Sequence, residues 1–313
     1  MKKRLLTGAK PTGDLHLANY FGALKPFVDM YAGYESYLMV ADLHALTTVR
    51  NGVEMRAQIL NIARTYLAIG VDPEKVILFK QSDVQEHTEL AWIFECQVTV
   101  PFLMQAHAYK DKVAKGVEAN AGLFNYPMLM AADILLYDAE IVPVGEDQRQ
   151  HIEYAREAAG KFNRAFDTEI FVAPQELVVE GVGTVPGTDG QKMSKSYKNT
   201  IPLFGSKEDI AKAVMSIVTD SSGERPQHVY AIHALFRTEE ELNTLYEENK
   251  GRYKNLKDAL IADIESMVSP MREKYESISD AEVIRILKDG GDRARERASL
   301  KMKEVRKIIG ISL

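Results

Sequence analysis

The order of apolar and amphipathic segments predicts a doubly wound, parallel α/β sheet followed by an all-helical domain. Up to about residue 162, short apolar segments of strand length alternate with segments of helix length. This alternation is typical of parallel sheets, because each parallel connection needs a crossover that is usually a helix. Beyond about residue 207 the strand-like segments disappear while helical spacing continues. We therefore expect an α/β domain over residues 1–200 and a helical domain over residues 201–313.

The first two thirds of the chain contain the alternating elements. Residues 4–9 form a short apolar segment that predicts a strand, and Gly8, Pro11 and Gly13 then indicate a turn. A helical period resumes over residues 15–31. The other expected strands are 35–42, 76–81 and 139–144. The other expected helices are 55–69, 86–98 and 148–162. Segment 171–189 is rich in Val, Gly and Pro and is expected to form irregular strands and loops.

The last third of the chain predicts helices only. Pro270 interrupts one of these periodic segments and is expected to kink or break the helix. Trp92, the single tryptophan of the chain, lies in an expected helix further upstream, where we assign it to helix packing. The expected helices of this part are 208–219, 239–249, 253–275 and 280–309.

The composition is that of an ordinary globular protein, with 46% hydrophobic and 27% charged residues among 313. The longest apolar runs, such as 38–41, are far shorter than the roughly 20 residues of a membrane helix. The basic residues 2–4 are not followed by the apolar core of a signal peptide. One cysteine, Cys96, excludes an intramolecular disulfide framework and a metal site made of cysteines alone. We expect a soluble, cytoplasmic protein.

Charge is distributed unevenly along the chain. The net charge is -6, yet residues 281–313 contain nine basic and five acidic residues. A basic tail on an acidic body can mark a contact with a polyanion. A solvated helix face explains the same pattern, so both interpretations stay open.

The first candidate site is the segment from Lys10 to Asn19, at the expected strand-to-helix turn. Ligands of open α/β sheets bind at the carboxyl ends of the strands, and Gly13 allows the backbone to approach a ligand closely. His16 and Asn19 are three residues apart, so they share a helix face and can hydrogen-bond to phosphate oxygens near the helix N-terminus. A helix cap with an incidental histidine is the alternative interpretation.

The second candidate site is Lys192-Met-Ser-Lys-Ser196, which follows a glycine-containing segment at 186–190. Two lysines three residues apart, flanked by hydroxyl groups, can converge on a polyphosphate as point charges. A lysine-rich surface loop is the alternative, but the first motif in the same chain favours phosphate binding.

Together, the two motifs resemble those of the class I aminoacyl-tRNA synthetases, and the second matches letter for letter. The blocks from Tyr126 to Tyr137 and from Ile141 to His151 are similar to those of the tryptophanyl-tRNA synthetases. This resemblance extends over residues 6–310. It implies a Rossmann-type nucleotide-binding domain, a helical domain on the anticodon side, and a homodimer. It also implies that the protein activates L-tryptophan with ATP to tryptophanyl-adenylate and pyrophosphate, and then transfers tryptophan to its tRNA.

Such a reaction needs no enzyme nucleophile, because the amino-acid carboxylate attacks the α-phosphorus of ATP and catalysis is positioning and charge stabilisation. The resemblance implies ATP with Mg²⁺ as a substrate and no structural metal. It assigns catalytic roles to His16, Asn19, Lys192 and Lys195. The implied ATP contacts are Lys10, Pro11, Thr12, His16, Ala18 (a glycine in most relatives), Asn19, Lys112 (otherwise a surface lysine), Gly145, Glu146, Asp147, Val185, Lys192, Met193, Ser194, Lys195 and Ser196.

An indole-binding pocket needs an apolar slot with one acceptor, because the indole nitrogen only donates. Asp133 follows Met130 in an otherwise apolar stretch, and the resemblance implies that it accepts from the indole; otherwise it would cap a helix or bind the backbone. His44 and Gln148 are implied to lie near the ammonium and carboxylate of the substrate. The implied tryptophan contacts are Asp133, Met130, His44, Gln148, Val142, Val144 and Leu6, which replaces an aromatic residue common in relatives.

Two other functions stay open. A tyrosyl-type synthetase shares the architecture, but a tyrosine pocket needs a partner for the phenol hydroxyl. A synthetase-like regulator would bind nucleotide without charging tRNA, and the intact Lys192 and Lys195 argue against it. The expected partners are L-tryptophan, ATP, the tRNA specific for tryptophan and a second copy of the chain, with no membrane.

Overall fold

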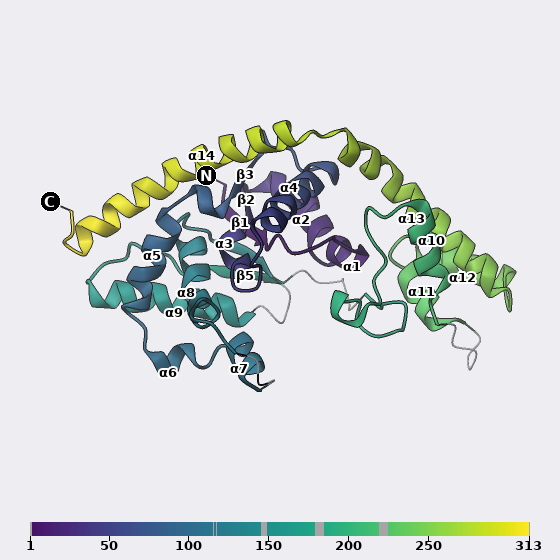
Figure 1. The fold of residues 1–313 in the computed structure, drawn as a ribbon, viewed down its shortest axis with the longest axis horizontal. Helices are drawn as coiled ribbons and strands as arrows, with labels where there is room; N and C mark the ends of the chain where they lie inside the picture. The colour runs from purple at the N-terminus through teal and green to yellow at the C-terminus, as the bar shows by residue number, and fades with distance from the viewer. Residues whose placement is uncertain are drawn as a thin grey trace. The chain divides into compact units, whose positions relative to one another are not determined.

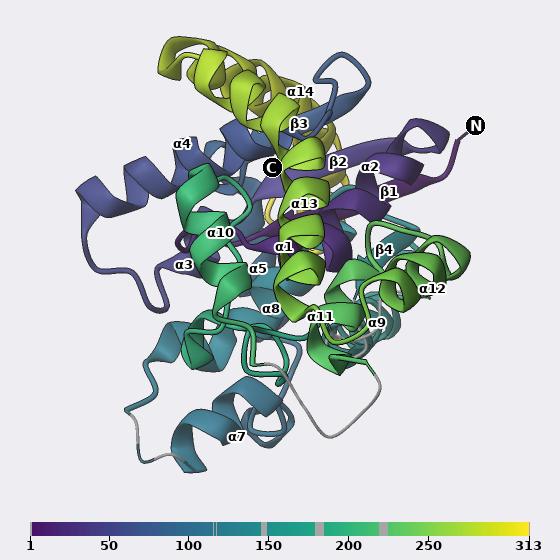
Figure 2. The same cartoon turned by 90° about the vertical axis from the view of Figure 1, so that its right-hand side faces the viewer.

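The chain divides into two compact units, shown in the computed structural model of Figure 1 and Figure 2. The structure describes residues 2–114, 116, 118–144, 149–178, 185–218 and 225–312, without the side chains of Ala108 and Lys112. Unit 1 comprises Met1–Thr12, Phe27–Val179 and Ser279–Leu313, and unit 2 comprises Gly13–Pro26 and Glu180–Ile278. This division differs from the expected single boundary at residue 200, because the chain passes into unit 2 at Gly13 and its last helix belongs to unit 1.

Unit 1 contains a parallel sheet of five strands in the order β3-β2-β1-β4-β5. Leu6 lies opposite Tyr37 in the register of β1 and β2, and Leu38 lies opposite Leu78 in that of β2 and β3. From β1 the chain winds outward to β3 and then continues on the other side at β4, which confirms the predicted doubly wound order. The strands are β1 (Arg4–Ala9), β2 (Glu35–Val40), β3 (Val76–Lys80), β4 (Ile141–Val144) and β5 (Gln175–Val178), the last within the segment expected to be irregular.

Most helices of unit 1 have one apolar face. α9 buries Ile152, Ala155 and Ala159, which recur at intervals of three and four residues. α4 begins after Asn51, whose side chain accepts the backbone N–H of Val53 at 2.9 Å. The elements between Lys25 and Ala165 are α2 (Lys25–Met30), η2 (Tyr31–Gly33), α3 (Asp42–Ala45), α4 (Gly52–Ala68), η3 (Gln81–Asp83), α5 (Glu86–Glu95), α6 (Val100–Leu103), α7 (His107–Ala114), α8 (Ala121–Leu135) and α9 (Arg149–Ala165). The α-helices α3, α6, α7 and α8 were not predicted.

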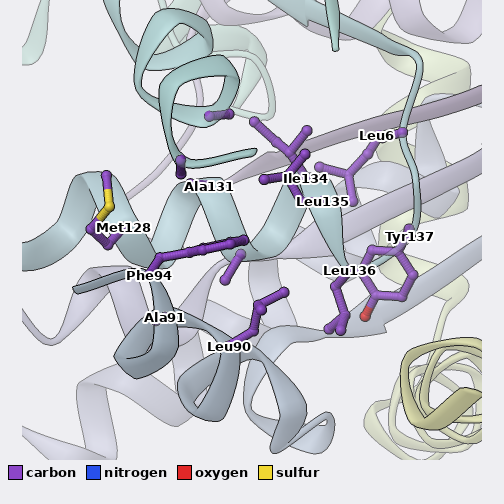
Figure 3. Packing of buried hydrophobic residues seen from close by; sticks show 14 of the residues in the cluster. Leu6, Leu90, Ala91, Phe94, Met128, Ala131, Ile134, Leu135, Leu136 and Tyr137 are labelled. Carbon is purple, nitrogen blue, oxygen red and sulfur yellow. The ribbon is translucent and has the colours of Figure 1, made fainter. Parts of the chain in front are cut away.

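A large part of the core lies around α5 and α8 (Figure 3). Leu90 and Phe94 of α5 and Met128 of α8 are completely buried. α8 contacts both α5 and α9 and is apolar on several sides, with Pro127 inside it, so it lacks the single face that marks a surface helix. The expectation for Trp92 of α5 is wrong, because this side chain is 66% exposed rather than packed between helices.

α14 (Asp280–Ile308) belongs to unit 1 and packs along β3. Gly290 allows this close packing, since a Cβ atom there would lie 1.9 Å from the backbone oxygen of Leu78. Arg297 and Lys301 each lie 2.5 Å from a carboxylate oxygen of Asp138, which precedes β4. Part of the basic excess near the C-terminus therefore pairs with acidic groups of unit 1, and neither of the two expected uses of this charge accounts for it.

Unit 2 is helical apart from its loops among the residues that the structure describes. Asp263 of α13 lies 2.8 Å from His233 Nε2 and 2.5 Å from Arg237 Nε, which ties α11 to α13. α13 continues through Pro270, so of the expected kink or break the break is absent. No helix in the described ranges combines the length and apolarity needed to cross a membrane. The elements are α1 (Leu17–Asn19), η1 (Tyr20–Leu24), η5 (Lys195–Tyr197), α10 (Lys207–Met215), α11 (Gln227–His233), α12 (Glu239–Glu248) and α13 (Tyr253–Ser277).

Candidate active site

The strand order of unit 1 creates a switch point between β1 and β4. These strands are neighbours, and the connections that follow them lead to opposite sides of the sheet. Ligands of such sheets bind beyond the carboxyl ends at this point. Lys10, Pro11 and Thr12 follow β1 directly, and Lys10 Nζ lies 5.6 Å from the ring centre of Tyr126. The predicted residues that follow β4, Gly145, Glu146, Asp147 and Gln148, lie outside the described residues, as does the side chain of Lys112.

Asp133 of α8 is the centre of a buried polar cluster in unit 1. Its carboxylate is 2% exposed, and Oδ2 lies 2.8 Å from Nε2 of His44. Oδ1 accepts a hydrogen bond of 2.8 Å from Nε2 of Gln81 and lies 2.6 Å from Nδ1 of His87. The other ring nitrogen of His87 lies 2.9 Å from the Tyr137 hydroxyl. Protein groups therefore already satisfy much of the hydrogen-bonding capacity of this carboxylate, for which the sequence predicts a ligand as the partner.

These contacts keep the Asp133 carboxylate ionised. Burial alone would raise its pKa, but the adjacent His87 and His44 outweigh burial and hold the pKa well below its usual range. An ionised carboxylate only accepts hydrogen bonds, so Nε2 of His44 must carry the proton toward it. Nδ1 of His44 is buried and has no hydrogen-bond partner among the described residues. In the neutral ring this atom is an acceptor that a bound donor, such as an ammonium group, would satisfy.

Gln81 ties the cluster to the end of β3 and to α3. Its side-chain amide donates to Asp133, while its Oε1 accepts from the backbone N–H of Leu43 at 3.2 Å and of His44 at 3.4 Å. Because Gln81 is completely buried, it holds the first turn of α3, and thus His44, in one position relative to Asp133.

The predicted apolar contacts lie on α8, β1 and β4. Met130 is half-buried and precedes Asp133 by three residues, so both side chains lie on the same face of α8. Val144 is half-buried at the end of β4, whereas Val142 and Leu6 are buried within the core cluster. Met130 and Val144 are thus the more accessible of these predicted wall residues.

Most of the first motif lies in unit 2, around the start of α1, whereas Lys10, Pro11 and Thr12 belong to unit 1. His16 is the N-cap of α1, and the backbone N–H of His16 donates to Asn19 Oδ1 at 3.1 Å. Leu17 N–H donates to the backbone oxygen of Ile201, and Leu203 N–H donates to that of Leu15, both at 3.0 Å. These backbone bonds join the first motif to the chain that follows the second motif.

Asn199 organises the loop that carries the second motif. Its Oδ1 accepts from Ser194 N–H at 2.8 Å, and its Nδ2 donates to the Lys192 backbone oxygen at 3.1 Å and to Asp189 Oδ1 at 2.7 Å. Met193 N–H also donates to the backbone oxygen of Val185 at 2.9 Å. Asn199 is only 2% exposed, and Met193 and Val185 are buried, while Lys192, Lys195 and Ser196 are exposed. The buried side-chain amide of Asn199 thus holds the loop in place, while the lysine residues of the loop are exposed.

The two motifs meet where Lys195 lies over Gly13. A Cβ atom at Gly13 would be 3.1 Å from Lys195 Nζ, and Gly13 has a φ of +67°, which side chains rarely adopt. His16 is buried nearby, and burial together with the charge of Lys195 lowers the pKa of His16 to about 4. Its Nδ1 has no hydrogen-bond partner in the described part of the chain. Lys195 Nζ therefore lies close to Gly13 and acts on the neutral imidazole of His16 at the start of α1, a combination suited to phosphate.

Sequence reasoning missed three residues of these clusters. Gln81 follows the carboxyl end of β3 directly, and the same rule that pointed to Lys10 after β1 could have found it. No local pattern indicates His87 or Asn199, because their partners are distant or their role is to satisfy backbone groups of a loop.

Comparison with known proteins agrees with this architecture. A profile of the family described as tRNA synthetases class I (W and Y) matches residues 1–283. The tryptophan–tRNA ligase of Fusobacterium nucleatum is 43% identical over 99% of this chain and 98% of its own length, and that of Rhodopirellula baltica is 45% identical over 98% and 99%. The crystal structure of the Campylobacter jejuni tryptophanyl-tRNA synthetase with ADP and tryptophan has a TM-score of 0.92 and 41% identity, covering 98% of this chain and 99% of that chain. This chain therefore belongs to the class I tRNA synthetases of the tryptophan and tyrosine group.

Within this family, the full-length similarity is to tryptophan–tRNA ligases. The predicted family, the Rossmann-type fold class and the tryptophan–tRNA ligase activity are confirmed, in preference to the tyrosyl-type and regulatory alternatives. ATP as the nucleotide substrate is likewise in accord with the ADP complex of the Campylobacter jejuni enzyme.

Proposed function

We propose that this protein forms tryptophanyl-adenylate from L-tryptophan and ATP, in the cytoplasm, and then esterifies the tRNA specific for tryptophan. The observation that supports this proposal is the close approach of Lys195 to Gly13 within unit 2, because it brings the second candidate phosphate motif against the Gly13–Asn19 part of the first. Adenylate formation releases pyrophosphate, so the cation that matters is the one that meets the charge developing on the leaving group.

Unit 1 supplies the recognition of tryptophan in this proposal. Asp133 accepts from the indole N–H with the remaining capacity of its ionised carboxylate, and His44 Nδ1 accepts from the α-ammonium group. Gln148 contacts the substrate carboxylate. The hydrophobic walls of the pocket consist of Met130, Val142, Val144 and Leu6.

Unit 2 supplies most of the phosphate contacts. Lys195 and Lys192 bind the pyrophosphate as it leaves, while His16 and Asn19 hold the ATP phosphates from the start of α1. The neutral state of His16 suits a hydrogen-bond donor that adds no charge of its own. Mg²⁺ enters with ATP, and the remaining ATP contacts are Lys10, Pro11, Thr12, Ala18, Lys112, Gly145, Glu146, Asp147, Val185, Met193, Ser194 and Ser196.

Pyrophosphate exchange tests the proposed activity directly. The purified protein is assayed with each of the twenty amino acids, and we expect tryptophan alone to support rapid exchange of labelled pyrophosphate into ATP. Aminoacylation of tRNA with labelled tryptophan tests the second step. Exchange that depends on tyrosine, or nucleotide binding without exchange, would refute the assignment.

We also propose that the active form is a homodimer. Trp92, Val100 and Met104 are 66%, 61% and 48% exposed, and they lie on α5 and around the short α6 that follows it. Large apolar side chains that are exposed and close in sequence are typical of interfaces. Trp92→Ser should yield a monomer in sedimentation equilibrium, whereas Val53→Ser, at another exposed apolar side chain, should not. A monomeric unmodified protein would refute the dimer.

The helical segment 201–313 is proposed to contact the anticodon side of the tRNA. Unit 2 contributes α10 to α13 to this segment, while α14 packs on unit 1. Because adenylate formation does not involve RNA, substitutions of exposed basic residues in α10 to α13 should lower aminoacylation and spare pyrophosphate exchange.

A further inference from the structure

A cavity lies in unit 1 between α4 and α14. These two helices contact each other and can be followed in Figure 1 and Figure 2. Its volume is about 880 Å³, in the range of pockets that enclose a whole small molecule. Neither the proposed tryptophan contacts nor the proposed ATP contacts line it. The proposed binding of tryptophan and ATP therefore does not explain this cavity.

The cavity has an apolar interior. Ile59 and Leu60 of α4 face it together with Leu287 of α14. At its margin, Leu46 and Ile284 line the cavity and remain 50% and 44% exposed. Water in contact with these side chains would be released by an apolar ligand, which favours binding of such a ligand.

Cations from both helices line the same cavity. Arg56 comes from α4 and Lys288 from α14, and neither forms a hydrogen bond or ion pair with any residue in the described ranges. By contrast, Lys80 is occupied, since its Nζ lies 2.6 Å from Asp83 Oδ1 and 3.9 Å from Asp42 Oδ2. The cavity is lined by five Lys or Arg residues and three Asp residues, so its net charge is positive.

We propose that this cavity binds a small organic anion, an apolar body that carries one anionic group. The apolar body would contact Ile59, Leu60 and Leu287, and the anionic group would bind Arg56 of α4 and Lys288 of α14. An arginine favours such a group because its planar fork can donate two parallel hydrogen bonds to it. The lining contains no aromatic side chain, so it lacks the stacking surface that single-stranded RNA uses.

Two fluorescent probes that differ by one charge test this proposal. 8-Anilinonaphthalene-1-sulfonate has an apolar body and a sulfonate, and N-phenyl-1-naphthylamine has the same body without charge. Binding of each is titrated to the full-length protein with saturating tryptophan and ADP, which occupy the active site. We expect the sulfonate to bind more tightly than the neutral probe and to weaken as salt rises.

Three variants assign the binding to this cavity. Arg56→Gln with Lys288→Gln should weaken sulfonate binding about tenfold and leave the neutral probe unchanged. Lys303→Gln, at an exposed lysine of α14 outside the cavity, is the matched control and should change neither probe. Ile284→Trp should fill the cavity from its exposed margin and abolish the binding of both.

Several results would overturn the proposal. Equal sulfonate affinity in the double Gln variant and in the Lys303→Gln control would remove the cations from the site. Probe binding that survives Ile284→Trp would place the probe elsewhere. Displacement of the sulfonate by tRNA would assign the surface to RNA instead. Pyrophosphate exchange is measured in each variant and should stay unchanged, so the test is independent of the proposed activity.

Discussion

Replacement of Asp133 by asparagine tests whether the buried carboxylate both stabilises unit 1 and recognises indole. In the structure its two oxygens contact Gln81, His87 and His44, all of which can donate. An asparagine can keep its oxygen toward Gln81 and His87 only by turning its NH₂ group toward His44. That NH₂ group then occupies the position of Oδ2, the oxygen with the fewest protein contacts, and it cannot accept from an indole.

The expected magnitudes follow from these contacts. A hydrogen bond to a charged group contributes about 1.5–3 kcal/mol and a neutral one about 0.5–1.5 kcal/mol, so loss of the charge beside two imidazoles should lower the free energy of unfolding by about 2 kcal/mol. An indole N–H buried against a donor should cost a further 1–3 kcal/mol or so of tryptophan binding. This corresponds to roughly a 5- to 150-fold loss in kcat/KM for tryptophan-dependent exchange.

The decisive assay compares tryptophan with its benzothiophene analogue, in which sulfur replaces the indole nitrogen. The wild-type protein should prefer tryptophan, and Asp133→Asn should lose most of this preference, since the analogue never donated the hydrogen bond. Asp138→Asn is the matched control, because Asp138 is also buried and paired, with Arg297 and Lys301, but lies outside the cluster. It should lower the midpoint of urea unfolding and keep the preference. An unchanged preference in Asp133→Asn would show that Asp133 does not accept from the indole.

Three further predictions concern the phosphate motifs and the last helix. Lys195→Ala should lower the single-turnover rate of adenylate formation roughly 100-fold with little change in ATP affinity. The control Lys207→Ala, at an exposed lysine of α10, should change neither the rate nor the affinity. A loss of ATP affinity without a change in rate would show that Lys195 contacts ATP in the ground state only. The pKa of His16 is lowered from 6.5 to about 4, so between these pH values the unfolded chain binds a proton that the folded chain does not. Folding stability should therefore fall as pH drops from 6.5 to 4. The urea midpoint of His16→Gln should depend less on pH than that of the unmodified protein, and an equal pH dependence of the two midpoints would contradict the assignment. Gly290→Ala should lower the free energy of unfolding by about 1–3 kcal/mol, because the new Cβ would collide with the backbone of β3 and this cost outweighs the gain in helix propensity. The control Gly52→Ala, with nothing near its Cβ, should be neutral or stabilising. Equal unfolding midpoints for the two variants would disprove the contact.

Local patterns in the sequence were sufficient to predict four of the five strands, most of the longer helices and the family, and to single out the two candidate phosphate motifs. Segments such as 4–9 and 76–81 are recognised as strands by their apolar content, and α14 is recognised as a helix by the spacing of its apolar residues. These signals can be read because each lies within one continuous segment of the chain. The residues of each motif are likewise consecutive, so no knowledge of distant contacts was needed to recognise them. α8 escaped prediction because it is buried on several sides and shows no single apolar face.

Contacts between distant parts of the chain were decided only by the tertiary structure. The sequence pointed to Asp133 as a carboxylate in need of a partner, but only folding shows that Gln81 and His87 already contact it. The position of Lys195 over Gly13 and the return of α14 to unit 1 also join segments far apart in sequence. Local periodicity reflects which face of one element is buried, whereas these contacts depend on how several elements pack together. For that reason the sequence alone predicted the chemistry of the site, and the packing of strands and helices determined which groups surround the predicted residues.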